Sequence, residues 1–460
     1  MERVALGLDV GTSALKVSVY SVEKQGVVKN INVKYLENEV APGISRLSKY
    51  TETIIDTINN IGDIYEVCSI ALSTQMYSFV VEEDGQKLVY QWNVPWKTDK
   101  KAAEVVAQYT NISGCPVDAL FPAYKIISSR LDEKSNLDIK PYGLQESIVY
   151  ELTGVLAGDY CNLSSYGFMN VLERKWNKEL LEKAGFNLNE MPKIVRYNEP
   201  VGPINNPKIK LNNKIIISCG LGDGPSASYA SKDVSNIAVN IGTSMAVRGF
   251  VEDVKEIDFK SVWTFVVDEN TWVSGGISSN GSSVLDHYRN IGFMKDWELT
   301  PSIADNNVFY FPWNHGERTP YWSSKLRETM VGAGMHTTKN DYMCAIFRGI
   351  SFTIATMYNE VNKHIDKTDM ICIAGGGANS EILMGYLSGT LPVKLGILQD
   401  FDFLGSYGAA YIAAEAMGER PIRNQNLIKI YVPTQQHVEV YKKWLDYSKM
   451  YSSLYEKMEG

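Results

Sequence analysis

Two copies of one short pattern decide the fold of this chain: Leu8-Asp9-Val10-Gly11-Thr12-Ser13 and Val239-Asn240-Ile241-Gly242-Thr243-Ser244. Gly242 follows Gly11 by 231 residues, which is about half of the 460-residue chain. An internal repeat at this spacing is typical of a protein built from two similar halves. We therefore predict two halves that share a local structure.

Each copy lies between two segments that are typical of β-strands. Residues 4–8 are apolar, and residues 14–20 alternate apolar and polar side chains with a period of two. The Gly-Thr-Ser segment between them supplies backbone freedom for a tight reversal, so we predict a β-hairpin. Residues 237–241 and 245–250 predict a second hairpin of the same kind.

Strands alternate with helices along the rest of the chain. Residues 214–219 and 369–374 predict buried strands, and each is followed by a glycine-rich turn that opens a helix. Further helices are predicted over residues 100–109, 144–152, 342–364 and 405–417. This alternation indicates an α/β fold, and the length allows two domains. We place the boundary near residue 232, which gives domains of residues 1–232 and 233–460.

The composition excludes several classes of protein. The chain has 45 Lys and Arg against 53 Asp and Glu, so it lacks the basic excess that nucleic-acid binding needs. It has no apolar run long enough to span a membrane and no apolar leader, which predicts a cytoplasmic protein. Six cysteines without a C-x-x-C pair predict buried, reduced thiols. The oligomeric state stays open, with a homodimer as one alternative.

The hairpin tips are the first candidate binding sites. Consecutive backbone N–H groups and hydroxyls at Gly11, Thr12 and Ser13 can form a concave site for phosphate oxygens. Gly242 and Thr243 repeat this arrangement in the second half, so two tips could hold one polyphosphate. The alternative interpretation is that each tip is only a turn.

Two carboxylates and one lysine are the candidates for the chemistry. Asp9 could hold Mg²⁺ through water, which is the usual way this ion is bound beside phosphates. Asp223 lies between two glycines where a strand passes into a helix, and a carboxylate there can accept a hydroxyl proton during phosphoryl transfer. Lys16 could add positive charge where a phosphoryl group develops charge. The structural alternatives are helix capping for Asp223 and a solvated position for Lys16.

A third glycine-rich turn follows the buried strand at residues 369–374. Bare backbone at Gly376 and Gly377 would let a flat ligand approach, and Asn379 and Ser380 could bind a ribose or a purine. Its alternative is a tight strand-to-helix turn. The five histidines lack metal-ligand spacing, and the P-loop and dinucleotide fingerprints are absent, so those classes of site have little support.

Taken in order, these motifs resemble those of the FGGY carbohydrate kinases. The resemblance covers nearly all of the chain and implies two actin-like (ribonuclease H-like) ATPase domains with the active site in the cleft between them. The motifs that carry it are Leu8–Ser13 with Lys16, Ser73–Met76, Ser113-Gly114 through Tyr124-Lys125, Leu152–Gly154 with Asp159-Tyr160, Gly220–Asp223, Asn240–Ser244, Gly275-Gly276 with Asn280-Gly281, Gly316–Trp322, Gly375–Ala378, and Gly405 with Gly408–Ala410.

The resemblance implies a cytoplasmic enzyme that phosphorylates a small sugar, sugar acid or polyol with ATP and Mg²⁺. Asp223 would then be the general base and Asp9 the Mg²⁺ ligand, while both hairpins would bind the phosphates. The turn at residues 376–380 would carry the nucleoside. The first domain would hold the sugar and the first hairpin, and the second domain would bind the nucleotide.

The sugar side departs from the family pattern. The residues expected there are Gln75, Met76, Tyr77, Trp96 and Asp223. Many members have His where this chain has Tyr77, and the usual Trp-x-Asp-x-Arg is replaced by Trp96-Lys97-Thr98-Asp99-Lys100. The sequence leaves open whether Thr98 or Asp99 fills the acidic position.

Three functions remain as hypotheses at this point. The first is a sugar kinase that acts on gluconate or on a ketose such as xylulose. The second is a sensor or regulatory protein that binds a nucleotide on the same fold without turnover. The third is an ATPase of the actin or chaperone type, which the sugar-kinase motifs disfavour. Fold alone does not separate these functions.

Overall fold

The computed structural model describes residues 1–36, 39–293, 307–365, 368–423 and 426–458. The chain forms two compact units, and neither is continuous in sequence. The first unit comprises residues 1–233, 251–273 and 402–424, and the second comprises residues 234–250, 274–401 and 425–460. The first crossing between units is at residues 233 and 234, and two later segments of the chain return to the first unit.

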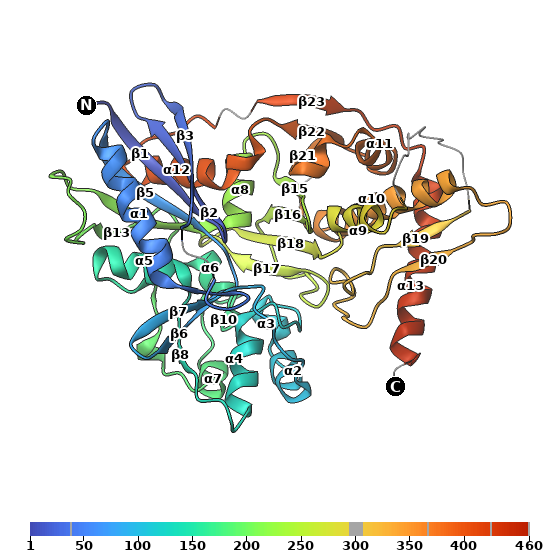
Figure 1. The fold of residues 1–460 in the computed structure, drawn as a ribbon, viewed down its shortest axis with the longest axis horizontal. Coiled ribbons are helices and arrows are strands. Elements are labelled where there is room, and N and C mark those ends of the chain that lie inside the picture. Colours follow the sequence, from blue (N-terminus) through green and yellow to red (C-terminus); the bar gives the residue numbers. More distant parts are fainter. Residues whose placement is uncertain (37–38, 294–306, 366–367, 424–425, 459–460) are drawn as a thin grey trace. The chain divides into compact units, whose positions relative to one another are not determined.

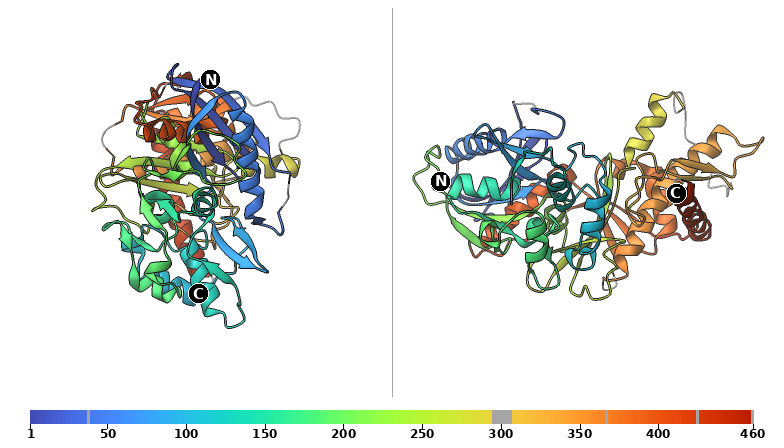
Figure 2. Two further views of the ribbon diagram at one scale, coloured as in Figure 1. Left: turned by 90° about the vertical axis from the view of Figure 1, so that its left-hand side faces the viewer. Right: turned by 90° about the horizontal axis from the view of Figure 1, so that it is seen from below.

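The first unit contains most of the strands and helices of the chain (Figures 1 and 2). Its strands are β1 (Arg3–Val10), β2 (Ala14–Ser21), β3 (Gly26–Lys34), β4 (Ile44–Arg46), β5 (Glu66–Thr74), β6 (Phe79–Glu83), β7 (Gln86–Tyr90), β8 (Asp138–Lys140), β9 (Ala157–Asp159), β10 (Met169–Asn170), β11 (Lys175–Trp176), β12 (Lys193–Val195), β13 (Pro200–Pro203), β14 (Ile216–Gly222) and β17 (Trp263–Val266). Its helices are α1 (Leu47–Gly62), α2 (Lys100–Ala107), α3 (Thr110–Ser113), α4 (Pro122–Leu131), α5 (Leu144–Thr153), α6 (Tyr160–Ser164), α7 (Lys178–Lys183), α8 (Asp223–Ala230) and α12 (Leu404–Ala416).

The main sheet of the first unit has the strand order β13-β14-β5-β1-β2-β3. β1 pairs antiparallel with β2 and parallel with β5, and β5 pairs parallel with β14. Because side chains alternate along a strand, Leu6, Leu8 and Val10 face the core shared with α1 and α5, and Gly7 faces α12. Helices therefore cover both faces of this sheet, which is the α/β arrangement expected from the sequence.

A second apolar core lies in the same unit. It forms around the sheet β4-β7-β6-β8 and the helices α2, α4 and α7. Phe79, Tyr124, Ile127 and Leu180 are buried in it, and Trp96 packs against it. The predicted acceptor residue Trp96 thus belongs to a folded subdomain of the first unit.

The second unit repeats the hairpin and the parallel strands beside it. Its strands are β15 (Ile237–Ile241), β16 (Met245–Val251), β18 (Trp272–Ser278), β19 (Phe309–Phe311), β20 (Thr329–Val331), β21 (Met370–Ala374), β22 (Lys394–Leu398) and β23 (Leu427–Tyr431). Its helices are α9 (Ser282–Asn290), α10 (Lys339–Asn362), α11 (Glu381–Thr390) and α13 (Val438–Met458). Six strands of a seven-stranded sheet lie in this unit, in the order β18-β16-β15-β21-β22-β23, and β15 is antiparallel to β16 and parallel to β21. α10 packs against α11, α13 and β19.

Both predicted hairpins are confirmed, but they are not identical. In the first, Val10 pairs with Leu15, which leaves four residues in the loop, and in the second Ile241 pairs with Met245, which leaves three. The expected reason for the glycines is wrong, because neither Gly11 nor Gly242 has a left-handed φ. A Cβ at Gly11 would lie 3.2 Å from Ala14 O, which is a tight contact, whereas one at Gly242 would lie 3.6 Å from Ser244 O, which is an ordinary contact.

Two smaller expectations can be compared with the structure. Five of the six cysteines are buried as predicted, and Cys68 is partly exposed. Of the helices in the described ranges, none combines the length and apolarity that a membrane crossing requires.

Two buried carboxylates, Glu146 and Asp159, lie behind the main sheet of the first unit. Both side chains are 0% exposed. Asp159 Oδ1 accepts bonds from the backbone N–H groups of Cys161 and Asn162 at 2.7 and 3.2 Å, and its Oδ2 has no hydrogen-bond partner among the described residues. Burial, with a further contribution from Glu146, raises the pKa of Asp159 from 3.8 to about 7.

This raised pKa makes the stability of the first unit depend on pH. Between pH 3.8 and about 7 the folded chain keeps a proton on Asp159 that the unfolded chain has lost, so the free energy of unfolding falls as pH rises. The slope from this group is at most about 1.4 kcal/mol per pH unit. We expect Asp159→Asn, which keeps the helix cap, to flatten the slope in urea unfolding measured across this range. An unchanged slope would contradict the assignment.

Candidate active site

The first hairpin presents its backbone amides and turns its carbonyls inward. Ser13 O accepts a bond from Tyr35 N at 3.4 Å, and Thr12 O accepts a bond from Lys49 Nζ at 3.2 Å. The N–H groups of Thr12 and Ser13 donate to no described residue, and Ser13 is exposed. Free amides beside anchored carbonyls form the kind of concavity that binds anions.

Lys49 of α1 is the cation behind this hairpin. Its side chain is 6% exposed, and its ammonium lies 5.1 Å from the ring centre of Tyr35 and 5.2 Å from that of Tyr50. The ammonium also donates to Ser45 Oγ at 3.2 Å. The ammonium thus contacts two aromatic rings and two oxygens, and its hydrogen bond fixes the direction of the Thr12 carbonyl.

Asp9 is the last but one residue of β1, next to the hairpin. Ser73 Oγ donates to Asp9 Oδ1 at 2.7 Å, and Asp9 pairs in register with Lys16 on β2. Burial is the main cause that raises the pKa of Asp9 to about 6; the charge of Asp223 adds to this rise, while Ser73 and Lys16 oppose it. The two aspartates are therefore within electrostatic reach of each other in one unit.

Asp223 is the first residue of α8 and is exposed. Its Oδ1 accepts a bond from Gly224 N at 2.7 Å, and the helix cap position is taken by Gly222. A Cβ on Gly222 would lie 2.4 Å from Met76 Cγ, so the Met76 side chain packs directly on the backbone beside Asp223. The end of β14 thus brings together two of the predicted residues.

Lys16 is partly exposed and held at the start of α12. Its ammonium donates to Asp402 O at 2.7 Å and lies 6.0 Å from the ring centre of Phe403. This position is compatible with the predicted role near a phosphoryl group, because the charge stays close to Asp9.

Tyr77 lies in an aromatic group on the predicted acceptor side. Its φ is +63°, and its ring makes edge contacts with Phe121 at 5.5 Å and Phe265 at 6.1 Å between centres. Phe265 stacks on Trp263 at 4.6 Å. The segment of residues 251–273 therefore supplies one of the rings that contact Tyr77, which the sequence did not indicate.

The contacts at the start of α2 bear on whether Thr98 or Asp99 fills the acidic position of the family pattern. Asp99 caps this helix, with Oδ1 accepting bonds from Lys101 N at 2.8 Å and Ala102 N at 3.1 Å. Tyr124 Oη bonds to both the backbone N and O of Asp99. Thr98 is exposed. The carboxylate of Asp99 is thus engaged in holding the helix.

Gln75 and Trp96 have neighbours in the protein interior. Gln75 is 3% exposed and donates from Nε2 to Tyr50 Oη at 3.1 Å. Trp96 is partly exposed and makes an edge contact with Phe79 at 6.1 Å. Gln75 therefore supports the segment that carries Met76, whereas Trp96 keeps part of its ring accessible.

The second hairpin shows the same orientation with different anchors. Thr243 O accepts bonds from Gly281 N at 3.0 Å and Ser283 Oγ at 2.9 Å, and Gly242 O accepts one from Ser282 N at 2.8 Å. The N–H groups of Thr243 and Ser244 donate to no described residue. This tip therefore has the properties of a phosphate site in the second unit.

The glycine-rich turn lies beside that hairpin. Residues Gly376–Asn379 form a 3₁₀ helix, and Ser380 caps α11 by accepting a bond from Leu383 N at 3.3 Å. A Cβ on Gly377 would lie 2.2 Å from Ile241 Cγ2, so the turn packs against the end of β15. Asn379 is exposed. The second unit thus places the predicted nucleoside and phosphate residues next to each other.

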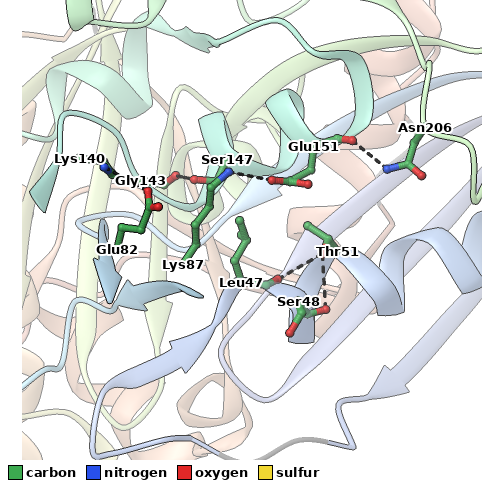
Figure 3. A network of polar contacts seen from close by, with 10 residues as sticks. All are labelled: Leu47, Ser48, Thr51, Glu82, Lys87, Lys140, Gly143, Ser147, Glu151 and Asn206. Carbon is green, nitrogen blue, oxygen red and sulfur yellow. Dashed lines mark hydrogen bonds and ion pairs between the residues drawn. The ribbon is translucent and has the colours of Figure 1, made fainter. Parts of the chain in front are cut away.

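A surface cavity of about 520 Å³ in the first unit contains none of these residues. Its lining residues include Arg46, Thr51, Lys87, Glu151 and Lys208. Lys87 pairs with Glu151 at 2.9 Å, which compensates both charges (Figure 3). The predicted site residues therefore lie outside this cavity.

Sequence reasoning missed Lys49, the rings around Tyr77 and the contact of Gly405 with Asp9. A Cβ on Gly405 would lie 2.7 Å from Asp9 Oδ2. Gly405 was part of a recognised motif, but its partner is almost 400 residues away in sequence. The other residues carry no local signal that could have revealed them.

Each of the two units has a hairpin beside parallel strands, and solved structures of a gluconate kinase and a xylulose kinase share this α/β fold. Residues 4–229 match the N-terminal domain, and residues 237–417 the C-terminal domain, of the FGGY family of carbohydrate kinases. The chain belongs to this family. Its members are phosphotransferases that act on carbohydrates.

Similar proteins include kinases with different acceptors in their names. A gluconokinase of Bacillus subtilis (strain 168) is 22% identical, over 91% of this chain and 88% of the relative. A xylulose kinase of Staphylococcus xylosus is 24% identical, over 90% of this chain and 91% of the relative. The crystal structure of gluconate kinase from Lactobacillus acidophilus superposes with a TM-score of 0.86 at 21% identity, covering both chains fully.

The hydrogen bond from Lys49 to Thr12 O predicts how a substitution at Lys49 changes the KM for the phosphoryl donor. Replacing Lys49 by Met removes the donor to Thr12 O from a buried position, which costs about 1–3 kcal/mol. We expect the KM for the phosphoryl donor to rise by roughly tenfold or more in steady-state kinetics.

The matched control is Lys87→Met, which removes a lysine from the first unit without touching the hairpin. Its donor KM should match that of the wild type. An unchanged donor KM in Lys49→Met would show that this lysine does not support a phosphate site.

Proposed function

We propose that this protein phosphorylates a small sugar or sugar acid with ATP, and that Asp223 is the general base. The observation that carries the proposal is the position of Asp223, exposed at the start of α8 and within electrostatic reach of Asp9. Both lie in the unit that also holds the first hairpin with its free amides. This set of groups is what phosphoryl transfer to an alcohol needs.

In the proposed reaction the acceptor hydroxyl gives its proton to the Asp223 carboxylate. The hydroxyl oxygen forms a bond to the γ-phosphorus, and the bond between that phosphorus and the bridging oxygen of the β-phosphate breaks. ADP leaves with the bonding electron pair. The exposed side chain of Asp223 supports an acceptor site at this place.

The phosphates would bind at the amides of both hairpins, and the turn at residues 376–380 would hold the nucleoside. Gly11, Thr12 and Ser13 supply the first set of groups, and Gly242 and Thr243 supply the second. Lys16, held by Asp402 O, would place positive charge near the transferred group.

The residues present fit a magnesium ion. Burial and the charge of Asp223 raise the pKa of Asp9, and a divalent cation near Asp9 would stabilise its carboxylate in the charged form. When bound, Mg²⁺ would neutralise charge on the phosphate oxygens. Asp9 is the residue we propose to hold it, with Ser73 fixing the carboxylate by its hydrogen bond.

Gluconate or a ketose such as xylulose is the proposed acceptor. The names of similar kinases support these classes of sugar. On the acceptor side we assign Tyr77, Met76 and Trp96 to contact the substrate, with Gln75 in support of Met76. The protein would act in the cytoplasm.

The general-base proposal is tested by Asp223→Asn. The amide can still accept the bond from Gly224 N, so the turn should stay intact, but it cannot take a proton. We expect kcat to fall by about 10²–10⁴-fold, with binding of Mg-ADP changed by less than about threefold. The measurements are coupled ADP release and isothermal titration calorimetry.

The same assay identifies the acceptor when it is run with gluconate, xylulose, ribulose, fuculose, rhamnulose, glycerol, erythritol and sedoheptulose. One strong acceptor whose turnover depends on Asp223 would support the proposal. No turnover with the whole panel, together with intact nucleotide binding, would favour the sensor function instead.

Tyr77→Phe tests the acceptor side separately. The substitution keeps the ring contacts with Phe121 and Phe265 and removes only the hydroxyl. We expect the KM for the acceptor to rise by roughly 3- to 10-fold, as for the loss of one hydrogen bond, with little change in the KM for ATP. A change confined to ATP would show that Tyr77 does not face the acceptor.

A further inference from the structure

The start of α9 contacts the second hairpin through its backbone. The first N–H groups of a helix have no partner within the helix. Here Gly281 N and Ser282 N donate to Thr243 O and Gly242 O at 3.0 and 2.8 Å, and Ser283 Oγ adds a bond to Thr243 O at 2.9 Å. These bonds hold the hairpin carbonyls on the protein side, so its free amides point away from α9.

The contact leaves no space between the two backbones. A Cβ on Gly281 would lie 2.4 Å from Gly242 O and 2.8 Å from Thr243 O. Distances below 3.0 Å require atoms to shift, and both neighbours here are backbone. The position of the hairpin therefore depends directly on the position of Gly281.

A buried carboxylate fixes the loop that carries Gly281. Glu317 is 3% exposed and accepts bonds from Ser278 Oγ at 2.9 Å, Asn280 Nδ2 at 3.4 Å and Arg318 N at 2.9 Å. Ser278 and Asn280 both precede the start of α9, so Glu317 anchors the chain just before the contact. An ionised carboxylate can accept several hydrogen bonds at once, because each of its two oxygens has free lone pairs.

Asn280 ties the same loop to the Gly316 segment. Its side chain is 0% exposed, donates to Gly316 O at 2.7 Å and accepts a bond from His315 N at 3.1 Å. Arg318 Nη1 donates to Ser279 Oγ at 2.7 Å. Each residue from 278 to 280 is therefore bonded to residues 315–318.

We propose that Glu317 is a positioning residue for nucleotide binding, which acts through the loop of residues 278–283 on the hairpin at Gly242 and Thr243. This inference rests on the proposed function, because it takes that hairpin as a phosphate site. It gives a role to the Gly316-Glu317-Arg318 motif and to Asn280-Gly281, which the transfer reaction itself does not use. Glu317 itself does not contact the ligand. It holds the loop by side-chain hydrogen bonds, and the loop holds the hairpin by backbone hydrogen bonds.

The direct test is Gly281→Ala, which adds one methyl group and changes no charge. Because the added carbon must displace the hairpin, we expect binding of Mg-ADP to weaken by about tenfold or more in calorimetry. The acceptor KM and kcat at saturating ATP should stay close to the wild-type values. Gly334→Ala is the matched control, since a Cβ there meets nothing within 4 Å in the same unit.

Glu317→Gln tests whether the carboxylate holds the loop. The substitution replaces one accepting oxygen by an NH₂ group, which would face other hydrogen-bond donors. We expect the same selective loss of Mg-ADP affinity, and Ser283→Ala should show a smaller loss while keeping the fold. Glu328→Gln is the control for the anchor, because Glu328 accepts bonds from Tyr288 and Asn314 outside the loop.

The outcomes separate this inference from the proposed function. Weak Mg-ADP binding in Thr243→Val, with normal binding in Gly281→Ala, Glu317→Gln and Ser283→Ala, would overturn the inference alone. Normal binding in Thr243→Val as well would overturn the proposed phosphate site. An equal loss in Gly334→Ala or Glu328→Gln would show a general effect on the unit and would also overturn the inference.

Discussion

The first unit depends on the close approach of α12 to β1 and α8. A Cβ on Gly7 would lie 2.0 Å from a carbonyl oxygen of α12, and one on Gly408 would lie 2.0 Å from a carbonyl oxygen of α8. On the same helix Gly405 contacts the carboxylate of Asp9. A side chain at Gly7 or Gly408 would separate the backbones, and one at Gly405 would displace the carboxylate of Asp9. This packing therefore fixes both the end of β1, which carries Asp9, and the helix that begins at Asp223.

The two hairpins show how different residues produce one backbone orientation. A carbonyl that is bonded on the protein side cannot turn outward, and the neighbouring amides are then left for a ligand. In the first unit the bond to Thr12 comes from the Lys49 side chain, whereas in the second the bonds to Thr243 come from the start of α9. The first arrangement adds a buried positive charge near the loop, and the second adds none. The two tips thus share a geometry but differ in electrostatics.

Local patterns predicted both hairpins, the strands β14 and β21, and the helices α2, α5, α8, α10, α11 and α12, because each depends on side-chain periodicity or turn residues within a short segment. The long helices α1 and α13 were not predicted. Local residue patterns also proposed Asp9, Asp223 and the glycine-rich turn as site residues, and the family resemblance assigned their roles. What could not be predicted depends on contacts between distant segments. Lys49 is an ordinary helix residue until α1 packs behind the hairpin, and residues 251–273 gave no sign that they return to the first unit. The loops also differ by one residue, which the similar sequences conceal.

The residues of the proposed acceptor side explain why the identity of the substrate cannot be inferred from that of the relatives. The carboxylate of Asp99 satisfies the first N–H groups of α2, and removing such a cap costs about 1 kcal/mol, so binding a sugar there would compete with the helix. The ring of Tyr77 contacts Phe121 and Phe265, at a position where many members of the family have an imidazole. A site of this kind would discriminate mainly by shape and by whether the acceptor can form a hydrogen bond with the tyrosine hydroxyl. The acceptor should therefore be a sugar whose apolar face fits against these rings and whose hydroxyl meets Tyr77.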